Sequence, residues 1–125
     1  MAESTTPPPT FAGARVEKPW GHELIWAHTE RYVGKILHIK AGHALSFQYH
    51  LVKDETICVW QGSLRLVLGE GEAQVERVLG PGQSVHLTPG TRHRMIAVTD
   101  CDVMEASTPE LDDVVRLDDR YGRTR

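Results

Sequence analysis

Residues 42–62 read GHALSFQYHLVKDETICVWQG and contain two short runs rich in aromatic, aliphatic and β-branched side chains. The first run, Leu45–His50, alternates apolar with polar side chains, which is the period of a strand that turns one face to a core. The second run, Thr56–Gln61, carries apolar side chains on alternate positions and ends at a glycine, as a half-buried strand does. This stretch therefore predicts two neighbouring strands joined by a short connection.

The same pattern continues on both sides of this stretch. From Val16 onward, short apolar segments are punctuated by Gly, Pro or Asp about every ten residues, which is typical of an all-β domain. The expected strands are His22–Ala27, Tyr32–Lys40, Leu45–His50, Thr56–Gln61, Leu64–Leu68, Gln74–Leu79, Ser84–Thr88, His93–Val98 and Asp102–Ala106. Because roughly nine short strands would otherwise leave exposed edges, we expect a jelly-roll barrel.

Length and composition exclude several classes of protein. The chain has 125 residues, fewer than the roughly 150 of an average domain, so a single domain is expected. Its 14 basic and 17 acidic side chains give a net charge of −3, and no block concentrates the positive charge. We therefore expect no nucleic-acid partner. No apolar run exceeds four residues, which excludes a transmembrane helix, so no membrane partner is expected.

The first 14 residues differ in composition from the rest of the chain. They are rich in Ser, Thr, Pro and Ala, and lack both a basic start and the apolar stretch of a secretory signal. We expect residues 1–14 to form a disordered tail and residues 15–125 to form one domain. The absence of Arg before Arg15 also argues against an organelle transit peptide, so a cytoplasmic location is expected.

Four polar side chains fall on strand faces that can meet inside such a barrel. Gln48 and His50 share one face of their strand, and Glu55 begins a face that is otherwise apolar. His93 likewise opens an apolar face of a later strand. Two imidazole nitrogens and two oxygens suit zinc, manganese, iron, cobalt or nickel. Spacing alone also leaves open the alternative that these are ordinary hydrogen-bonded or exposed polar residues.

The glycines around these residues identify a resemblance. Gly42, Gln48, His50, Glu55 and Gly62 resemble the first motif of the cupin superfamily, with Gln48 in place of the first histidine. The second motif is matched by Gly82, Pro89, Gly90 and His93. The resemblance implies an all-β cupin double-stranded β-helix, which is a jelly-roll barrel, over residues 15–125.

A narrower resemblance covers nearly all of the chain after the tail. It is carried by VEKPWGHE at 16–23, Tyr32-x-x-Lys35, LSFQYH at 45–50, PGTRHR at 89–94 and DDVVRLDDRYGR at 112–123. These segments are similar to the cupin domain of type II phosphomannose isomerases. The resemblance implies that Gln48, His50, Glu55 and His93 bind a divalent metal, with zinc favoured. It also implies aldose–ketose isomerisation of a sugar phosphate through a metal-stabilised enediolate.

The reaction requires further residues around the metal. Lys35 shares strand parity with Leu37 and Ile39, so an inward-facing Lys35 would serve as base or sugar-phosphate contact; the alternative is that its ammonium extends to the barrel mouth. Lys35 and Glu55 are the expected catalytic residues. The expected substrate-binding residues are Lys35, Lys53, Arg94, Arg116 and Tyr121.

Three of these assignments carry their own alternatives. Lys53 stands where the family usually has arginine, and so keeps the charge without the bidentate fork. Arg94 faces away from His93 along its strand, which fits either a contact at the rim or a surface ion pair. Residues 112–123 are by composition a solvated charged segment, whereas the resemblance implies that they fold back over the barrel.

Two other functions remain open from sequence. Two histidines and one glutamate also supply much of the site of an iron or nickel dioxygenase or lyase. Such an enzyme would act on a small metabolite. Alternatively, the domain binds a small carbohydrate or metabolite without turnover. For the isomerase the expected partner is a small anionic sugar-like substrate, and the resemblance implies a homodimer.

Overall fold

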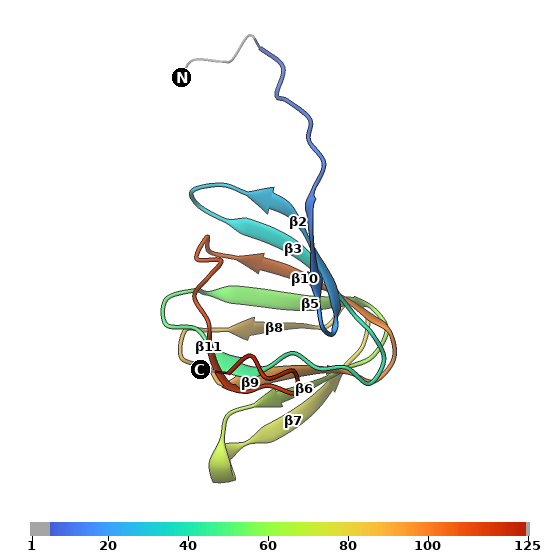
Figure 1. The fold of residues 1–125 in the computed structure, drawn as a ribbon, viewed down its shortest axis with the longest axis vertical. Helices are drawn as coiled ribbons and strands as arrows, with labels where there is room; N and C mark the ends of the chain where they lie inside the picture. The colour runs from blue at the N-terminus through green and yellow to red at the C-terminus, as the bar shows by residue number, and fades with distance from the viewer. Residues whose placement is uncertain (1–5, 125) are drawn as a thin grey trace.

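The computed structural model describes residues 6–124, and its elements are nearly all strands (Figure 1). They are β1 (Ala14–Lys18), β2 (Gly21–His28), β3 (Val33–Ile39), β4 (Phe47–Tyr49), β5 (Glu55–Gln61), β6 (Leu64–Leu68), the 3-10 turn η1 (Gly71–Ala73), β7 (Val75–Leu79), β8 (Ser84–Leu87), β9 (His93–Ala97), β10 (Cys101–Ser107) and β11 (Val115–Asp118).

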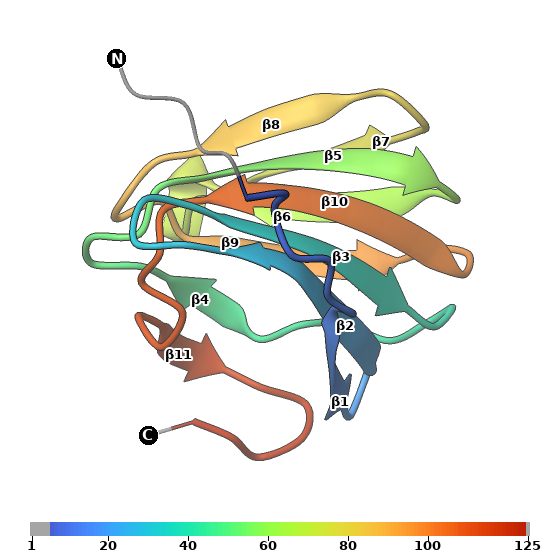
Figure 2. The same ribbon diagram turned by 90° about the horizontal axis from the view of Figure 1, so that it is seen from above.

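The strands form two antiparallel sheets. The first has the order β1-β2-β3-β10-β5-β8 and the second has the order β11-β4-β9-β6-β7. The sheets lie face to face, with β11 beside β4 (Figure 2). Because strands distant in sequence are neighbours, as β10 is to β3 and β5, both sheets contribute side chains to one enclosed interior.

Alternating burial shows which face of each strand is turned inward. In β3, β5 and β10 every second side chain is buried, and Leu37, Ile57 and Val103 are examples. Burying a side chain of this kind contributes roughly 1.5–3 kcal/mol, so the two-residue period holds the register of the sheets. The same parity places polar side chains of these strands, described below, on the inner face.

The expected strands agree closely with the structure. The nine predicted ranges correspond to β2 through β10, and each end lies within two residues of the observed one. β4 is the shortest of them. In a regular strand Leu45 and Phe47 would share one face, but the chain before β4 is irregular, and Leu45 packs in the core. The jelly-roll arrangement of two antiparallel sheets is confirmed.

Two strands were not expected. Ala14 begins β1, which pairs with β2, and β11 pairs with β4. Of the expected N-terminal tail, residues 1–5 lie outside the described residues, and residues 6–13 have no helix or strand. Within residues 6–124, no helix is long and apolar enough to cross a membrane.

Gly62 shows why a motif glycine is needed at the turn between β5 and β6. Its φ is +88°, a region that favours glycine, and a Cβ at this position would collide with the carbonyl oxygen of Asp100. The tight turn keeps β5 and β6 in different sheets, and so helps to close the barrel around the interior.

Candidate metal centre

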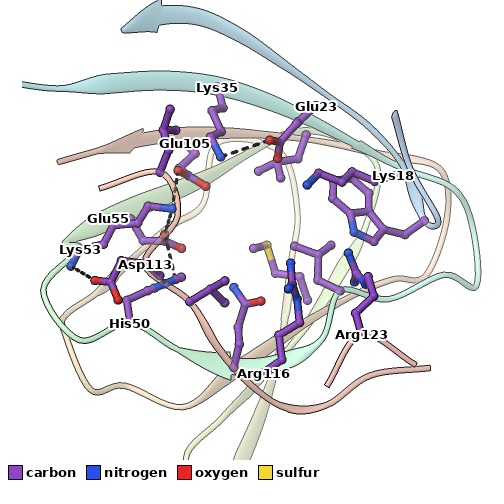
Figure 3. A pocket seen from close by; sticks show the side chains of 17 residues that line it. Lys18, Glu23, Lys35, His50, Lys53, Glu55, Glu105, Asp113, Arg116 and Arg123 are labelled. Atoms are coloured by element: carbon purple, nitrogen blue, oxygen red, sulfur yellow. Dashed lines mark hydrogen bonds and ion pairs between the residues drawn. The ribbon is translucent and has the colours of Figure 1, made fainter. Parts of the chain in front are cut away.

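A polar cavity lies between the two sheets, with a volume of about 90 Å³ (Figure 3). Its walls come from both sheets and from residues 111–123, which we call the C-terminal segment. Charged side chains dominate the wall: Lys18, Lys35, Lys53, Arg116 and Arg123 are basic, and Glu23, Glu55, Glu105 and Asp113 are acidic. The cavity therefore combines an excess of positive charge with several carboxylates.

Three buried side chains converge at one end of this cavity. His50 follows β4, Glu55 begins β5 and His93 begins β9. The Nε2 atom of His50 lies 3.3 Å from Glu55 Oε2, and the Nε2 atom of His93 lies 3.8 Å from Glu55 Oε1. One potential ligand atom from each residue lies within 4.8 Å of the others, a spacing that can accommodate a metal ion.

Backbone carbonyl groups orient both histidine rings. His50 Nδ1 lies 2.5 Å from the carbonyl oxygen of Asp113, and His93 Nδ1 lies 2.8 Å from that of Thr91. A carbonyl only accepts, so each Nδ1 carries the hydrogen and each Nε2 keeps its lone pair. Among the described residues neither Nε2 has a hydrogen-bond partner. Two buried lone pairs facing one carboxylate fit a divalent cation.

The electrostatics of these groups favour the forms that bind metal. Burial alone would raise the pKa of Glu55, but the close contact with His50 and the charge of Lys53 lower it well below its usual range. Burial lowers the pKa of His93. At neutral pH Glu55 is therefore ionised and His93 is neutral, and both states are required of metal ligands.

Gln48 lies in the cavity wall beside the three converging side chains. It is the cross-strand partner of His93, and its Oε1 accepts a hydrogen bond of 2.6 Å from the Ser46 hydroxyl. An amide oxygen has two lone pairs, so this hydrogen bond leaves one for a metal. The fourth ligand expected from the sequence stays a prediction.

Lys35 points into the cavity from β3 and does not extend to solvent. It is 6% exposed, and its Nζ donates a hydrogen bond of 3.4 Å to Glu23 Oε1 on β2. Lys35 thus shares the inner face of β3 with Leu37 and Ile39, as strand parity predicted. Lys35 and Glu23 together form a buried acid–base pair facing the interior.

Lys53 is the centre of a second buried pair of contacts. Its Nζ lies 2.9 Å from Glu55 Oε2 and 3.0 Å from Glu105 Oε2, and Glu105 also accepts a hydrogen bond from the Ser107 hydroxyl. Burial alone would lower the pKa of Lys53, but the carboxylates of Glu105 and Glu55 raise it above its usual value. The Lys53 ammonium is therefore charged, and it holds Glu55 through Oε2, the same oxygen that His50 Nε2 approaches.

The C-terminal segment folds back over the barrel, as the resemblance implied. Leu111, Asp113, Val114, Arg116 and Arg123 line the cavity. Figure 3 shows Lys18, Arg116 and Arg123 on one side of the cavity, with His50, Lys53 and Glu55 on the other. The positive side chains of this segment thus lie across the cavity from the candidate metal centre.

Two of the expected substrate-binding residues do not line the cavity. Arg94 alternates with His93 on β9 and so faces outward, where it contacts Asp118 Oδ2 at 3.1 Å and the carbonyl oxygen of Leu45. The structure thus shows the surface ion pair of the two alternatives, and a role of Arg94 in substrate binding stays a prediction. Tyr121 packs against the core, and its hydroxyl lies 2.6 Å from His43 Nδ1, so it supports the C-terminal segment without lining the cavity.

Sequence reasoning missed five charged residues of the cavity: Lys18, Glu23, Glu105, Asp113 and Arg123. Glu105 had a usable signal, because it continues the inward face of Cys101 and Val103 just as Glu55 begins an apolar face. Asp113 and Arg123 gave no such signal, since strand parity says nothing of a segment without a regular period. Their place in the cavity follows from tertiary contacts alone.

Comparison with known proteins adds to this geometry. The family described as mannose-6-phosphate isomerase C-terminal matches residues 10–119. Mannose-1-phosphate guanylyltransferase ManC of Salmonella typhimurium is 34% identical over 113 residues, which are 86% of this chain and 23% of that protein. The xanthan biosynthesis protein XanB of Xanthomonas campestris is 30% identical over 115 residues, which are 88% of this chain and 24% of that protein.

The chain thus spans about a quarter of the length of these relatives. Among solved structures, oxalate decarboxylase from Bacillus subtilis superposes with a TM-score of 0.73 at 15% identity, covering 92% of this chain and 33% of that one. At this identity the likeness concerns the fold, and it confirms the cupin double-stranded β-helix expected from the sequence.

Proposed function

The chain belongs to the mannose-6-phosphate isomerase C-terminal family, and from this membership and the chemistry of the cavity we propose that it is a metal-dependent isomerase of a sugar phosphate. The observation that carries the proposal is the convergence of His50, Glu55 and His93 in a cavity whose basic side chains outnumber its acidic ones.

The donor set supports a divalent ion, and zinc is the one we expect. His50, Glu55 and His93 would hold it, with Gln48 as the fourth ligand, because this mixture of nitrogen and oxygen donors suits zinc and its neighbours in the first row. When bound, such an ion supplies positive charge that stabilises negative charge developing on the sugar oxygens. The remaining work falls to side chains of the cavity.

Binding of the anionic group falls to the basic side chains across the cavity. Arg116, Arg123 and Lys18 lie opposite His50 and Glu55, so a phosphate held there would leave the sugar carbons directed at the metal centre (Figure 3). Arginine forks suit phosphate oxygens through paired N–H donors. The separation of the two groups gives the substrate one orientation in the cavity.

Proton transfer between neighbouring carbons requires one base that reaches both of them. We assign this role to Lys35, whose Nζ is buried in the cavity and bonded to Glu23. The Nζ of Lys35 would take a proton from one carbon and return it to the next, and the contact with the Glu23 carboxylate holds the side chain in the cavity. The isomerisation needs no external oxidant, since both changes occur within one sugar.

The size of the cavity sets a condition on binding. Its volume of about 90 Å³ is well below the roughly 300–1,000 Å³ of pockets that hold small organic ligands. Outward movement of the C-terminal segment would make room for a sugar phosphate. Closure of the segment over the ligand would then exclude water from the reacting carbons.

The proposal is tested by incubating zinc-loaded protein with aldose and ketose hexose 6-phosphates in heavy water. We expect interconversion with solvent deuterium incorporated at the exchanged carbon, and a loss of at least 100-fold in Lys35→Ala with zinc content unchanged. The matched control is Lys40→Ala, since Lys40 is exposed just beyond β3, and it should retain the wild-type rate.

Two other results would replace the proposal. Binding of a hexose phosphate without deuterium incorporation would make the domain a sugar-binding cupin without turnover. Oxygen consumption by iron-loaded protein, with no isomerisation, would instead favour the dioxygenase alternative.

A further inference from the structure

Asp113 makes an unusual number of contacts with the chain that follows β4. Its Oδ1 accepts a hydrogen bond from the backbone N–H of Leu51 at 3.0 Å, and its Oδ2 accepts from those of Val52 at 2.7 Å and Lys53 at 2.8 Å. Three consecutive N–H groups thus converge on one carboxylate. The turn between His50 and Glu55 is therefore held from outside the barrel sheets by a residue of the C-terminal segment.

The same residue also fixes the ring of His50. Its carbonyl oxygen lies 2.5 Å from His50 Nδ1, which leaves Nε2 aimed at Glu55. His93 makes a useful contrast, because its Nδ1 is fixed by the carbonyl of Thr91, two residues earlier in the same turn. One histidine of the candidate centre is thus oriented locally and the other by a contact 63 residues distant in sequence.

We infer that Asp113 is a positioning residue for the metal centre, which sets the ring of His50 through its carbonyl group and holds the following turn through its carboxylate. The inference rests on the proposed metal binding and adds to it that tight binding requires the C-terminal segment in its closed position. Groups that orient metal-ligating histidines typically change metal affinity about 10–100-fold when altered. Asp113 acts through His50 and does not itself face the metal position.

The geometry gives this arrangement a second consequence. Arg116 and Arg123 belong to the same segment as Asp113 and line the cavity, so a ligand that contacts them holds the segment closed. The closed position of the C-terminal segment and the oriented ring of His50 then occur together. By linkage, a ligand that favours closure strengthens metal binding by the same factor as metal strengthens binding of that ligand.

The test measures zinc affinity of the full chain by competition with a chromophoric chelator, with no sugar present. Asp113→Asn removes the carboxylate charge while keeping the side chain's size, and we expect at least tenfold weaker zinc binding. Asp112→Asn is the matched control, because Asp112 is exposed beside it, and its zinc affinity should stay within twofold of wild type. A folded Asp113→Asn protein with wild-type zinc affinity would overturn the inference.

A second measurement keeps the inference testable if Asp113→Asn does not fold. In metal-free wild-type protein labelled with ¹⁵N-histidine, we expect His50 to carry its hydrogen on Nδ1, with Nε2 unprotonated. A His50 with its hydrogen on Nε2 and none on Nδ1 would overturn the role of the Asp113 carbonyl. These readouts are separate from catalysis: a wild-type chain that binds zinc without isomerising any sugar refutes the proposed reaction and leaves the inference standing.

Discussion

Glu55 is the residue on which both halves of the site depend. Its Oε2 contacts both Lys53 and His50, and its Oε1 faces His93. An ionised carboxylate would be costly in the interior without these partners. The buried Lys53 ammonium therefore explains how Glu55 stays charged in the protein even without a metal, and so keeps the centre ready to bind one.

Removal of either histidine should abolish tight metal binding. We expect His50→Ala and His93→Ala to lose at least tenfold in zinc retained after dialysis, since each takes away one of the nitrogen donors. Elemental analysis measures this, with circular dichroism to check the fold. His86→Ala is the control, because His86 is exposed and bonded to Asp54 outside the cavity. Equal zinc content in all three variants would contradict the centre.

The two cysteines should react at very different rates. Burial raises the pKa of the Cys101 thiol to about 11, so at pH 8 it has almost no thiolate. Cys58 is only half-buried. In the native protein iodoacetamide should therefore modify Cys58 and leave Cys101 intact until the chain unfolds, as mass spectrometry of the peptides would show. Rapid labelling of Cys101 in folded protein would be inconsistent with its burial.

Sequence was most informative for residues whose strand parity has a chemical meaning. Glu55, His93 and Lys35 each interrupt an otherwise apolar face. Lys35 and Glu55 line the cavity, and the buried His93 contacts Glu55 beside it. Strand parity also placed Arg94 on the opposite face from His93. The structure agrees with parity, although Arg94 lies in a segment that carries the family resemblance. Asp113 had no such signal, because its partners lie about 60 residues away and are backbone groups.

At the level of whole elements, β1 and β11 were the strands that could not be predicted. β11 has only four residues, which alternate apolar with charged side chains, and it forms because β4 offers an edge to pair with. Short strands of this kind are determined by tertiary context more than by propensity. Strand patterning alone therefore left the C-terminal segment without a defined place, and only the family resemblance implied that it folds back over the barrel.

The end of the C-terminal segment is held by a tight ion pair. Arg123 contacts both oxygens of Asp119 through its guanidinium at 2.9 and 3.0 Å, and its backbone N–H also donates to Oδ2. These contacts lower the pKa of Asp119 below its usual value. Because Arg123 lines the cavity, this pair places one of the cavity's positive charges.

Asp119→Asn should destabilise the protein in a pH-dependent way. The folded pKa of Asp119 is depressed, so its contribution is fully present above the unfolded value of about 3.9 and is lost as pH falls through the folded pKa. We expect the variant to lose roughly 1–3 kcal/mol at neutral pH. Thermal melts should show this difference from wild type shrinking below about pH 4.

Asp112→Asn serves as the control for this loss of stability, because Asp112 is exposed. A difference between Asp119→Asn and wild type that stayed constant from neutral to acid pH would show that loss of the charge is not its cause.

At the scale of the whole molecule, the candidate ligands join the two sheets. Glu55 belongs to the six-stranded sheet, whereas His93 belongs to the five-stranded sheet and His50 follows β4 of that same sheet. A metal held between them would bind the folded arrangement and not the unfolded chain, in which the ligands are far apart. Binding of a metal would thus be coupled to folding of the two sheets.

Zinc should therefore raise the thermal stability of the chain. For a ligand that binds only the folded state, free zinc at about 100 times its dissociation constant adds about 2.7 kcal/mol. Calorimetry with zinc or with a chelator would measure the shift, and His93→Ala should show little of it. An identical melting temperature of the wild-type chain in zinc and in chelator would contradict the link between the sheets.

The contacts of Asp113 also bear on how the protein keeps its metal over time. Under the proposed route of entry, a sugar that displaces the C-terminal segment would also release His50 from the Asp113 carbonyl. Each such displacement would give the ion a chance to exchange with the medium. Loss of metal would then follow turnover of the sugar, and an idle protein, with the segment seated on the turn after β4 as it is here, would keep its ion longest.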